Sequence, residues 1–314
     1  MGLGSNQTVT GIDVGSSSVK IVRLAHKRGG SVEVVGVALA EIAVPSSQGA
    51  SDMLDVRERV AAAINQALAS TGVDPGRVGT VVTAISGASV SVKHVSFPDM
   101  SDKELAESVR WEAKKHLPFD PENVDLDYQK LARNDVETDE NAHVLLGAAQ
   151  DGVLDEHLSA LGDAGIEPSI VDLTPTALIN ELDEEGLMNG QAVAVADLGH
   201  SNAILSVYTR DGLFFARSIP IPAAQDTWLE HVLTEVRFSL TFYNNETGRK
   251  GIESLYLAGG RALESGVVGR FAETLGVPTE LLDPLAAAGA FELDGDLEAQ
   301  SPRFALAMGL ARRR

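Results

Sequence analysis

The chain begins with short apolar runs separated by tight turns, a pattern that predicts an antiparallel β-meander. Val9–Val14 is rich in β-branched residues, Gly15–Ser18 interrupts it, and Val19–Leu24 resumes the strand pattern. A third run, Val32–Ile42, completes the meander. Apolar residues near helical spacing then predict a helix over Met53–Ser70.

The middle of the chain mixes strand and helix patterns. Ser101-Asp-Lys-Glu104 is a capping box, in which the Ser hydroxyl and the Glu carboxylate satisfy free N–H groups, and it predicts a helix that runs to His116. A further helix is predicted over Asp151–Ala164. The further predicted strands are Val78–Ser86, Val90–Phe97, Val124–Leu131, Val144–Gln150 and Ser169–Leu173.

The second half repeats the opening order of elements. Gly11–Ser17 aligns with Val195–Ser201, because each segment has an Asp, one apolar residue, a Gly and small polar residues between two strands. Two related halves of this kind predict a two-lobed fold. The elements predicted here are strands Ala192–Leu198, Ala203–Tyr208, Leu213–Ile219 and Ser254–Leu257, and helices Gln225–Tyr243, Val267–Leu275 and Arg303–Arg312.

The composition narrows the class of protein. With 45 Asp and Glu against 25 Lys and Arg, the net charge is −20, which disfavours nucleic acid as a partner. The absence of cysteine removes disulfide scaffolds, thiolate metal sites and cysteine nucleophiles. No apolar run approaches the roughly 20 residues that span a bilayer, and the first residues lack the order of a signal peptide. We therefore expect a cytoplasmic protein.

The first hairpin carries residues suited to bind phosphate. Gly15 allows a ligand to approach the backbone closely, and the N–H groups and hydroxyls of Ser16, Ser17 and Ser18 can form an anion site. Lys20 can reach back to the turn as a point charge. Asp13 can hold Mg²⁺ through water, since this ion keeps its waters.

A second hairpin and a later strand end extend this candidate site. Asp197, Gly199 and Ser201 repeat the first turn. If the two lobes face each other, the two turns would hold one polyphosphate between them, and Asp13 and Asp197 would lie beside one Mg²⁺. Gly259 and Gly260, followed by Arg261, end an apolar strand. There a flat glycine surface can lie under a purine and its ribose. No residue is assigned a catalytic role.

The order of these three motifs is similar to that of the actin, Hsp70 and sugar-kinase superfamily. Within it, the chain resembles the PilM family, the cytoplasmic actin-like proteins of type IV pilus assembly. The most specific match is Val109–Phe119, which precedes the acidic strand Val124–Gln129. Further matches are Thr83–Gly87, Glu235–Leu240, Leu257–Gly260 and Ala305–Ala311.

The resemblance implies a two-lobed α/β fold of the actin-like ATPase type. The first lobe would comprise residues 1–88, with 166–189 and 302–314 returning to it. Residues 89–165 would form an inserted subdomain, as in PilM and FtsA, and 190–301 the second lobe. The implied cofactors are ATP and Mg²⁺. The implied partner is the N-terminal tail of a PilN-like membrane protein, which would hold the chain at the inner membrane.

The chain departs from the family pattern where a lid subdomain normally covers the adenosine. Few residues separate Ile219–Pro222 from the helix Leu229–Tyr243, Pro222-Ala223 replaces a Gly-Gly, and His200 is bulky. We therefore expect weakened nucleotide binding and at most weak ATPase activity. The alternatives are a small-molecule kinase of the superfamily and an FtsA-like filament or cell-division protein.

The partner groove is predicted beside the inserted subdomain. Leu117 and Phe119 would form an apolar wall, and Arg110 would contact backbone or carboxylate groups of the peptide. The strand Val90–Val95 would line the same groove. Trp111 lies on the polar side of its helix, so it is either covered by another segment or part of the partner surface.

Overall fold

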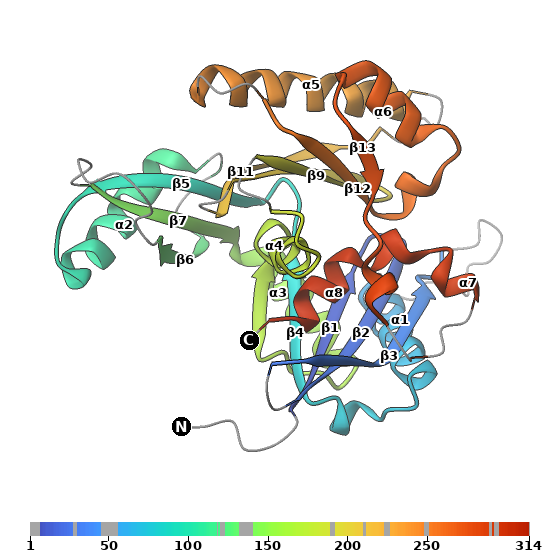
Figure 1. Cartoon of the computed structure of the whole chain (residues 1–314). Coiled ribbons are helices and arrows are strands. Elements are labelled where there is room, and N and C mark those ends of the chain that lie inside the picture. Colours follow the sequence, from blue (N-terminus) through green and yellow to red (C-terminus); the bar gives the residue numbers. More distant parts are fainter. Residues whose placement is uncertain are drawn as a thin grey trace.

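Three β-sheets organise the chain in a computed structural model (Figure 1). The structure describes residues 7–27, 30–44, 56–117, 119, 123–131, 141–188, 192–209, 212–222, 227–247, 251–288, 291 and 295–313. The first sheet has the order β3-β2-β1-β4-β8 and the second the order β11-β10-β9-β12-β13. The third sheet, β5-β7-β6, has three strands.

The strands of the first sheet are β1 (Gln7–Val14), β2 (Ser18–His26), β3 (Val32–Glu41), β4 (Thr80–Ile85) and β8 (Ile170–Leu173). Those of the second are β9 (Val193–Leu198), β10 (Asn202–Thr209), β11 (Gly212–Pro220), β12 (Ser254–Ala258) and β13 (Thr279–Leu281). In each sheet the central strand pairs antiparallel with the strand that follows it and parallel with a later one. This shared topology confirms the two related halves that the sequence repeat predicts.

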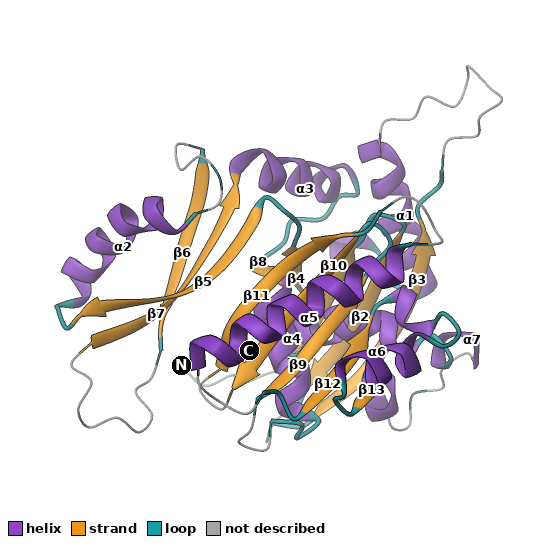
Figure 2. Cartoon of the chain, turned by 90° about the horizontal axis from the view of Figure 1, so that it is seen from above, coloured by secondary structure: helices purple, strands orange, loops and turns teal. Residues whose placement is uncertain are grey.

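Helices cover both sheets. Two central helices, α4 (Thr174–Glu184) and α8 (Ala305–Ala311), pack with apolar residues of both sheets in one core (Figure 1). On the outer side, α1 (Val56–Ser70) and α3 (Asp151–Asp163) cover the first sheet. The second sheet is covered by α5 (Trp228–Thr247) and α6 (Val267–Leu275), and α5 runs along it (Figure 2). The two lobes therefore share their inner helical layer.

The third sheet lies between β4 and β8 in the chain. It consists of β5 (Val90–Pro98), β6 (Val124–Lys130) and β7 (Asn141–Gln150), and α2 (Asp102–His116) packs on one of its faces. The capping box predicted at the start of α2 is confirmed. These elements fall inside the predicted inserted subdomain, whereas α3, at its predicted end, packs with α1 in the core of the first sheet.

Several predicted elements differ at their ends. The helix predicted from Met53 begins at Val56, and residues 53–55 lie outside the described part of the chain. The helix predicted over Gln225–Tyr243 is α5, which ends at Thr247. The last predicted helix is α8, preceded by a 3₁₀ turn over Ser301–Phe304. In the described ranges no helix is both long and apolar enough to span a membrane.

Candidate functional site

A cleft of about 620 Å³ lies where the two main sheets meet. Its floor and walls come from the β1–β2 turn, the β9–β10 turn and the end of β12. All twelve residues predicted to contact the cofactor line it: Asp13, Gly15, Ser16, Ser17, Ser18, Lys20, Asp197, Gly199, Ser201, Gly259, Gly260 and Arg261. Its volume is within the range of ordinary small-molecule sites.

The β1–β2 hairpin places a carboxylate and an ammonium group side by side. Asp13 and Lys20 are directly opposite each other in the strand register, and Lys20 Nζ lies 3.0 Å from Asp13 Oδ2. Both side chains are largely buried. The Gly15 N–H closes the turn by donating to the Ser18 carbonyl at 3.0 Å. The hairpin therefore brings the Lys20 ammonium group, paired with Asp13, and the hydroxyl groups of its turn serines to the same cleft.

The β9–β10 hairpin repeats this geometry. The Gly199 N–H donates to the Asn202 carbonyl at 3.0 Å, the same bond between equivalent positions. A Cβ atom on Gly199 would lie 2.7 Å from that carbonyl oxygen, so any larger residue would distort the turn. Across the cleft the Ser201 hydroxyl donates to the Ser16 hydroxyl at 2.9 Å.

Asp197 is the electrostatically unusual group of the cleft. Burial, and to a lesser extent the nearby Asp13 carboxylate, raise its pKa to about 6, while Lys20 opposes this shift. A buried carboxylate beside a second one is stabilised in its charged form by a cation. Carboxylates and hydroxyls are also the hard oxygen ligands, direct or through water, that Mg²⁺ prefers.

The end of β12 requires its first glycine. Gly259 has φ +85°, and a Cβ atom there would lie 2.5 Å from the Leu198 carbonyl oxygen and 2.6 Å from Asp197 Oδ1. The Gly259 N–H donates to the Pro302 carbonyl at 2.9 Å. Glycine alone therefore fits between the second hairpin and the chain that leads into α8.

Arg261 is held firmly on the wall of the cleft. Its Nε donates to the His200 carbonyl at 3.3 Å and its Nη1 to Glu264 at 3.1 Å. The guanidinium carbon lies 4.8 Å from the centre of the Trp228 ring. Trp228 is not among the sequence-predicted residues, because nothing in its sequence neighbourhood marks it.

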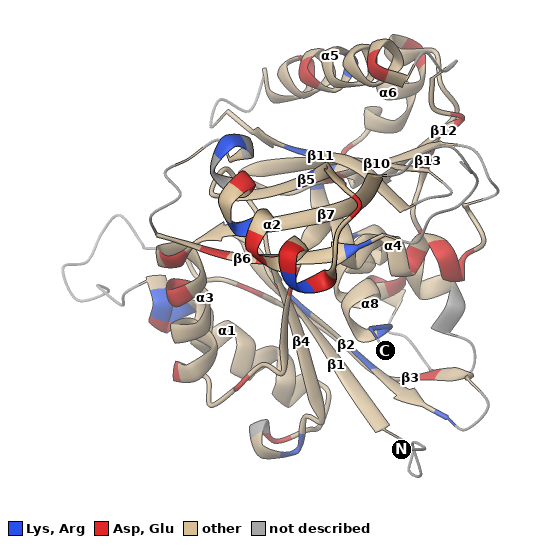
Figure 3. Cartoon of the chain, turned by 90° about the vertical axis from the view of Figure 1, so that its left-hand side faces the viewer, with Lys and Arg blue, Asp and Glu red and all other residues tan. Residues whose placement is uncertain are grey.

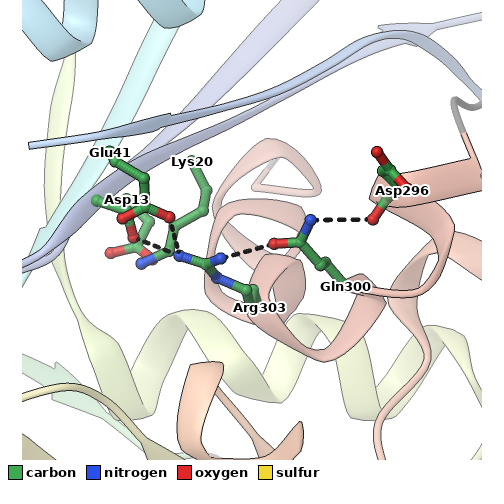
Figure 4. A network of polar contacts seen from close by, with 7 residues as sticks. Asp13, Lys20, Glu41, Asp296, Gln300 and Arg303 are labelled. Atoms are coloured by element: carbon green, nitrogen blue, oxygen red, sulfur yellow. Dashed lines mark hydrogen bonds and ion pairs between the residues drawn. The ribbon is translucent and has the colours of Figure 1, made fainter.

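Arg303 is a second cleft residue that sequence reasoning missed. Its Nη2 donates to Ser18 Oγ at 3.0 Å and to Glu41 at 2.8 Å, and its Nη1 donates to Gln300 at 2.6 Å (Figure 4). These contacts tie the 3₁₀ turn before α8 to the first hairpin. The only available signal was the basic residue at the start of the last predicted helix.

A second concavity, of about 490 Å³, lies between the first and third sheets. We call it the inter-sheet groove. Strands β6 and β8, each at the edge of its sheet, both line it, together with β7 and the chain end at Arg313. Val92 of β5 also lines it. An edge strand carries backbone groups free to pair with an added strand.

The inter-sheet groove is acidic. Asp125 and Asp127 are exposed residues of β6 that line it. Figure 3 shows acidic positions of the chain in red. Asp172 on β8 is buried and pairs with Arg313 at 3.1 Å. Its Oδ1 also accepts from the Leu173 N–H at 2.8 Å and from the Thr176 hydroxyl. The lining of the inter-sheet groove therefore includes three carboxylates, of Asp125, Asp127 and Asp172, and one guanidinium group, of Arg313.

A family model described as type IV pilus assembly protein PilM matches residues 11–227 and 225–314. The chain belongs to the PilM family. The match spans both main sheets and the third sheet between them, so the membership covers the cleft and the inter-sheet groove alike. The chain accordingly has the two-lobed actin-like fold of that family.

One solved structure agrees with this assignment, and two further structures are more distantly similar. A PilM–PilN type IV pilus biogenesis complex has a chain 25% identical, with a TM-score of 0.78 over 96% of this chain and 97% of that one. A Bacteroides thetaiotaomicron protein with an actin-like ATPase fold is 10% identical, with a TM-score of 0.48, covering 94% and 95%. The cytoplasmic domain of EpsL from Vibrio cholerae is 12% identical, with a TM-score of 0.49, covering 81% and 82%.

The residues predicted to bind the partner do not line the inter-sheet groove. Arg110, Trp111, Leu117 and Phe119 all lie at α2 or just beyond it, away from the groove lining. Trp111 is 70% exposed, so the alternative in which another segment covers it is wrong. A contact of these four residues with a partner stays a prediction.

Few residues join β11 to α5, at the place where the sequence predicts a shortened lid region. β11 ends at Pro220 and α5 begins at Trp228, so only residues 221–227 separate them in this PilM-family chain. Residues 223–226 lie outside the described part of the chain.

Proposed function

We propose that this chain is a cytoplasmic actin-like adaptor of a type IV pilus, or related secretion, assembly complex at the inner membrane. It docks to the N-terminal tail of a PilN-like membrane protein. The observation that carries the proposal is the match, over nearly the whole chain, to a chain of a PilM–PilN complex, together with the match to the PilM family model. The tail tethers the adaptor to the membrane.

The inter-sheet groove is the proposed docking site. An extended peptide can add to an exposed strand edge, where main-chain hydrogen bonds give affinity and side-chain pockets give specificity. Strands β6 and β8 offer two such edges facing one groove. Asp125 and Asp127 favour a tail that carries basic side chains.

The cleft is the proposed site for ATP with Mg²⁺. The turns at Gly15 and Gly199 line the cleft and would contact the phosphates, and Lys20 supplies a charge beside them. Asp13 and Asp197 would hold Mg²⁺ through water, and the raised pKa of Asp197 fits a carboxylate that gains from a cation. Bound nucleotide acts as a structural or switching ligand rather than as the substrate of rapid turnover.

Two single variants test the docking site. Asp127→Lys reverses a charge in the inter-sheet groove, and we expect it to abolish pull-down of a PilN-like N-terminal peptide. Arg110→Glu makes the same kind of change at the α2 position predicted from sequence. Both residues are exposed, so melting temperatures should stay close to wild type.

The variant that loses peptide binding shows whether the tail docks in the inter-sheet groove or at the end of α2. Loss with Asp127→Lys alone supports the inter-sheet groove, and loss with Arg110→Glu alone moves docking to the end of α2. Binding that survives both changes contradicts the groove as proposed. A wild-type chain that captures no such peptide contradicts the adaptor function itself.

A further inference from the structure

Asp172 is the buried carboxylate of the inter-sheet groove. It lies on β8, an edge strand, and is 8% exposed, whereas Asp125 and Asp127 are exposed on β6. Its Oδ1 accepts two hydrogen bonds, from the Leu173 N–H and from the Thr176 hydroxyl. Two bonds to one oxygen fix the orientation of the carboxylate before any partner arrives.

The other oxygen of Asp172 is poorly satisfied. Its Oδ2 is buried and accepts no hydrogen bond from the residues that the structure describes. Arg313 Nη1 lies 3.1 Å from this oxygen, so the two groups attract each other by charge without a well-aligned hydrogen bond. A buried carboxylate oxygen that has lost its water gains free energy from any group that donates to it.

Arg313 can move away from Asp172 without a change in the fold. Its side chain is 40% exposed, and its main chain is held separately, because its N–H donates to the Leu310 carbonyl at 3.1 Å. The preceding residue, Arg312, is fixed in the core by its pair with Glu181. A partly solvated guanidinium with a poorly aligned acceptor is a weakly held partner. The pair therefore opens by rotation of the Arg313 side chain alone.

The surroundings favour a cation at this place. Arg313 is the only basic residue among the described residues that line the inter-sheet groove. Most of the other lining residues are apolar, among them Leu145, Leu154 and Leu173. Because charges attract more strongly where water is excluded, an ion pair covered by a docked peptide is stronger here than on an open surface.

We propose that Asp172 is the anchor for one basic side chain of the docked tail, and that Arg313 is an internal competitor which this side chain displaces. The inference rests on the proposed docking function and adds the residue that selects the tail. In the free chain Arg313 neutralises Asp172. In the complex an Arg or Lys of the tail takes its place, and the Arg313 side chain turns into solvent. Affinity then depends on the difference between the two ion pairs.

Arg313→Met tests the competitor. It removes the internal cation, so a synthetic N-terminal peptide of the PilN-like protein should bind about threefold or more tightly in calorimetry. Arg57→Met is the matched control, because Arg57 is paired with Asp163 and neither residue lines the inter-sheet groove. It should change the affinity by less than about twofold. Both variants remove one positive charge, so a general effect of net charge would appear equally in both.

Asp172→Asn tests the anchor. The amide oxygen keeps an acceptor for Leu173 and Thr176, but the charge is lost, so peptide binding should weaken at least about tenfold. In this background Arg313→Met should no longer strengthen binding, since the gain requires the carboxylate. Each Arg and Lys of the peptide is also replaced by Gln in turn. At one position this change should make binding insensitive to Asp172→Asn. Urea unfolding checks that each variant is folded.

The outcomes separate this inference from the docking function itself. A wild-type chain that binds no such peptide contradicts the docking function and the anchor with it. If the wild-type chain binds, a gain with Arg313→Met no larger than that with Arg57→Met overturns the competitor. Unchanged affinity in Asp172→Asn, or a peptide with no basic position coupled to Asp172, overturns the anchor. If Asp172→Asn does not fold, Arg313→Lys decides, because it keeps the competing charge: affinity equal to that of Arg313→Met overturns the inference.

Discussion

The hydroxyls of Ser16 and Ser201 lie 2.9 Å apart, although 185 positions separate them in the chain. Each belongs to the turn of one hairpin, and each hairpin belongs to one of the two main sheets. The bond therefore marks the place where the two halves of the sequence repeat meet. A phosphate at this point would contact both lobes at once.

Replacing these hydroxyls should affect ligand binding more than stability. Both side chains are exposed, so Ser16→Ala and Ser201→Ala should each change the free energy of unfolding by less than about 0.5 kcal/mol. Each should weaken Mg²⁺·ATP binding several-fold, because a donor to phosphate is lost. Calorimetry and urea unfolding check the two effects. Ser70→Ala, at the end of α1, is the control, and equal affinity in all three variants would contradict the role.

We expect ATP binding to require Mg²⁺. Each cation that lines the cleft is already paired with a carboxylate: Lys20 with Asp13, Arg261 with Glu264, and Arg303 with Glu41. Asp197 adds a further acidic group. A free polyphosphate therefore meets no net positive charge, and the bound metal has to supply it.

Removal of Mg²⁺ with a chelator should weaken ATP binding at least about tenfold in calorimetry. The Asp197→Asn variant, which removes one of the carboxylates that the metal is expected to need, should lose most of this Mg²⁺ dependence. Equal ATP affinity with and without Mg²⁺ in the wild-type chain would show that the ion pairs open to bind phosphate unaided.

Asp197 should also lower the stability of the folded chain at neutral pH. Its folded pKa of about 6 lies above the ordinary value of 3.8, so the folded state holds its proton more strongly than the unfolded state. Stability from this group is greatest below about pH 4, falls as the pH rises to about 6, and is then constant. Asp197→Asn should therefore stabilise the chain by at most about 3 kcal/mol above pH 6.

Urea unfolding of both proteins between about pH 4 and pH 8 checks the sign. The advantage of Asp197→Asn should grow through the acidic half of this range and then level off. An advantage that is independent of pH would assign the effect to packing instead. The variant should bind Mg²⁺·ATP poorly, so stability and binding move in opposite directions.

The sequence was sufficient for the cleft because its chemistry is local. Asp13, Gly15 and Lys20 lie within one hairpin, and strand register alone places Asp13 opposite Lys20. The repeat then supplies the second hairpin. Trp228 and Arg303 escaped prediction because their places depend on packing between distant elements, which no local spacing encodes.

The inter-sheet groove shows the same limit. Its two edge strands are both present among the predicted strands, but which strands lie at an edge depends on the sheet order. That order placed β6 and β8 beside the groove and left Arg110 outside its lining. The family-specific Val109–Phe119 block attracted attention to α2, yet its buried members Val109 and Ala113 belong to the core of the third sheet.

Turnover of ATP should be far below the enzyme median of ~10 s⁻¹. Attack on a γ-phosphate needs a group that orients water and a site that excludes bulk solvent. The carboxylates Asp13 and Glu264 are engaged with Lys20 and Arg261, and only residues 221–227 join β11 to α5. Steady-state phosphate release measures this, and a rate near the median would contradict it.

The final prediction concerns the buried pair that anchors the end of α8. Arg312 Nε lies 2.6 Å from Glu181 Oε2, and the two side chains are 6% and 0% exposed. Burial raises the pKa of Glu181, and the Arg312 guanidinium opposes this. Arg312→Met should destabilise the chain by about 3–5 kcal/mol, because it leaves an unpaired carboxyl group in the core.

The double variant Glu181→Leu/Arg312→Met should recover most of this loss, since an apolar pair needs no partner. Lys115→Met, which breaks an exposed pair with Glu112, is the control and should cost less than about 1 kcal/mol. Urea unfolding of the four proteins decides the matter. A double variant no more stable than Arg312→Met would mean that the ion pair itself, rather than the relief of a buried charge, holds α8 in place.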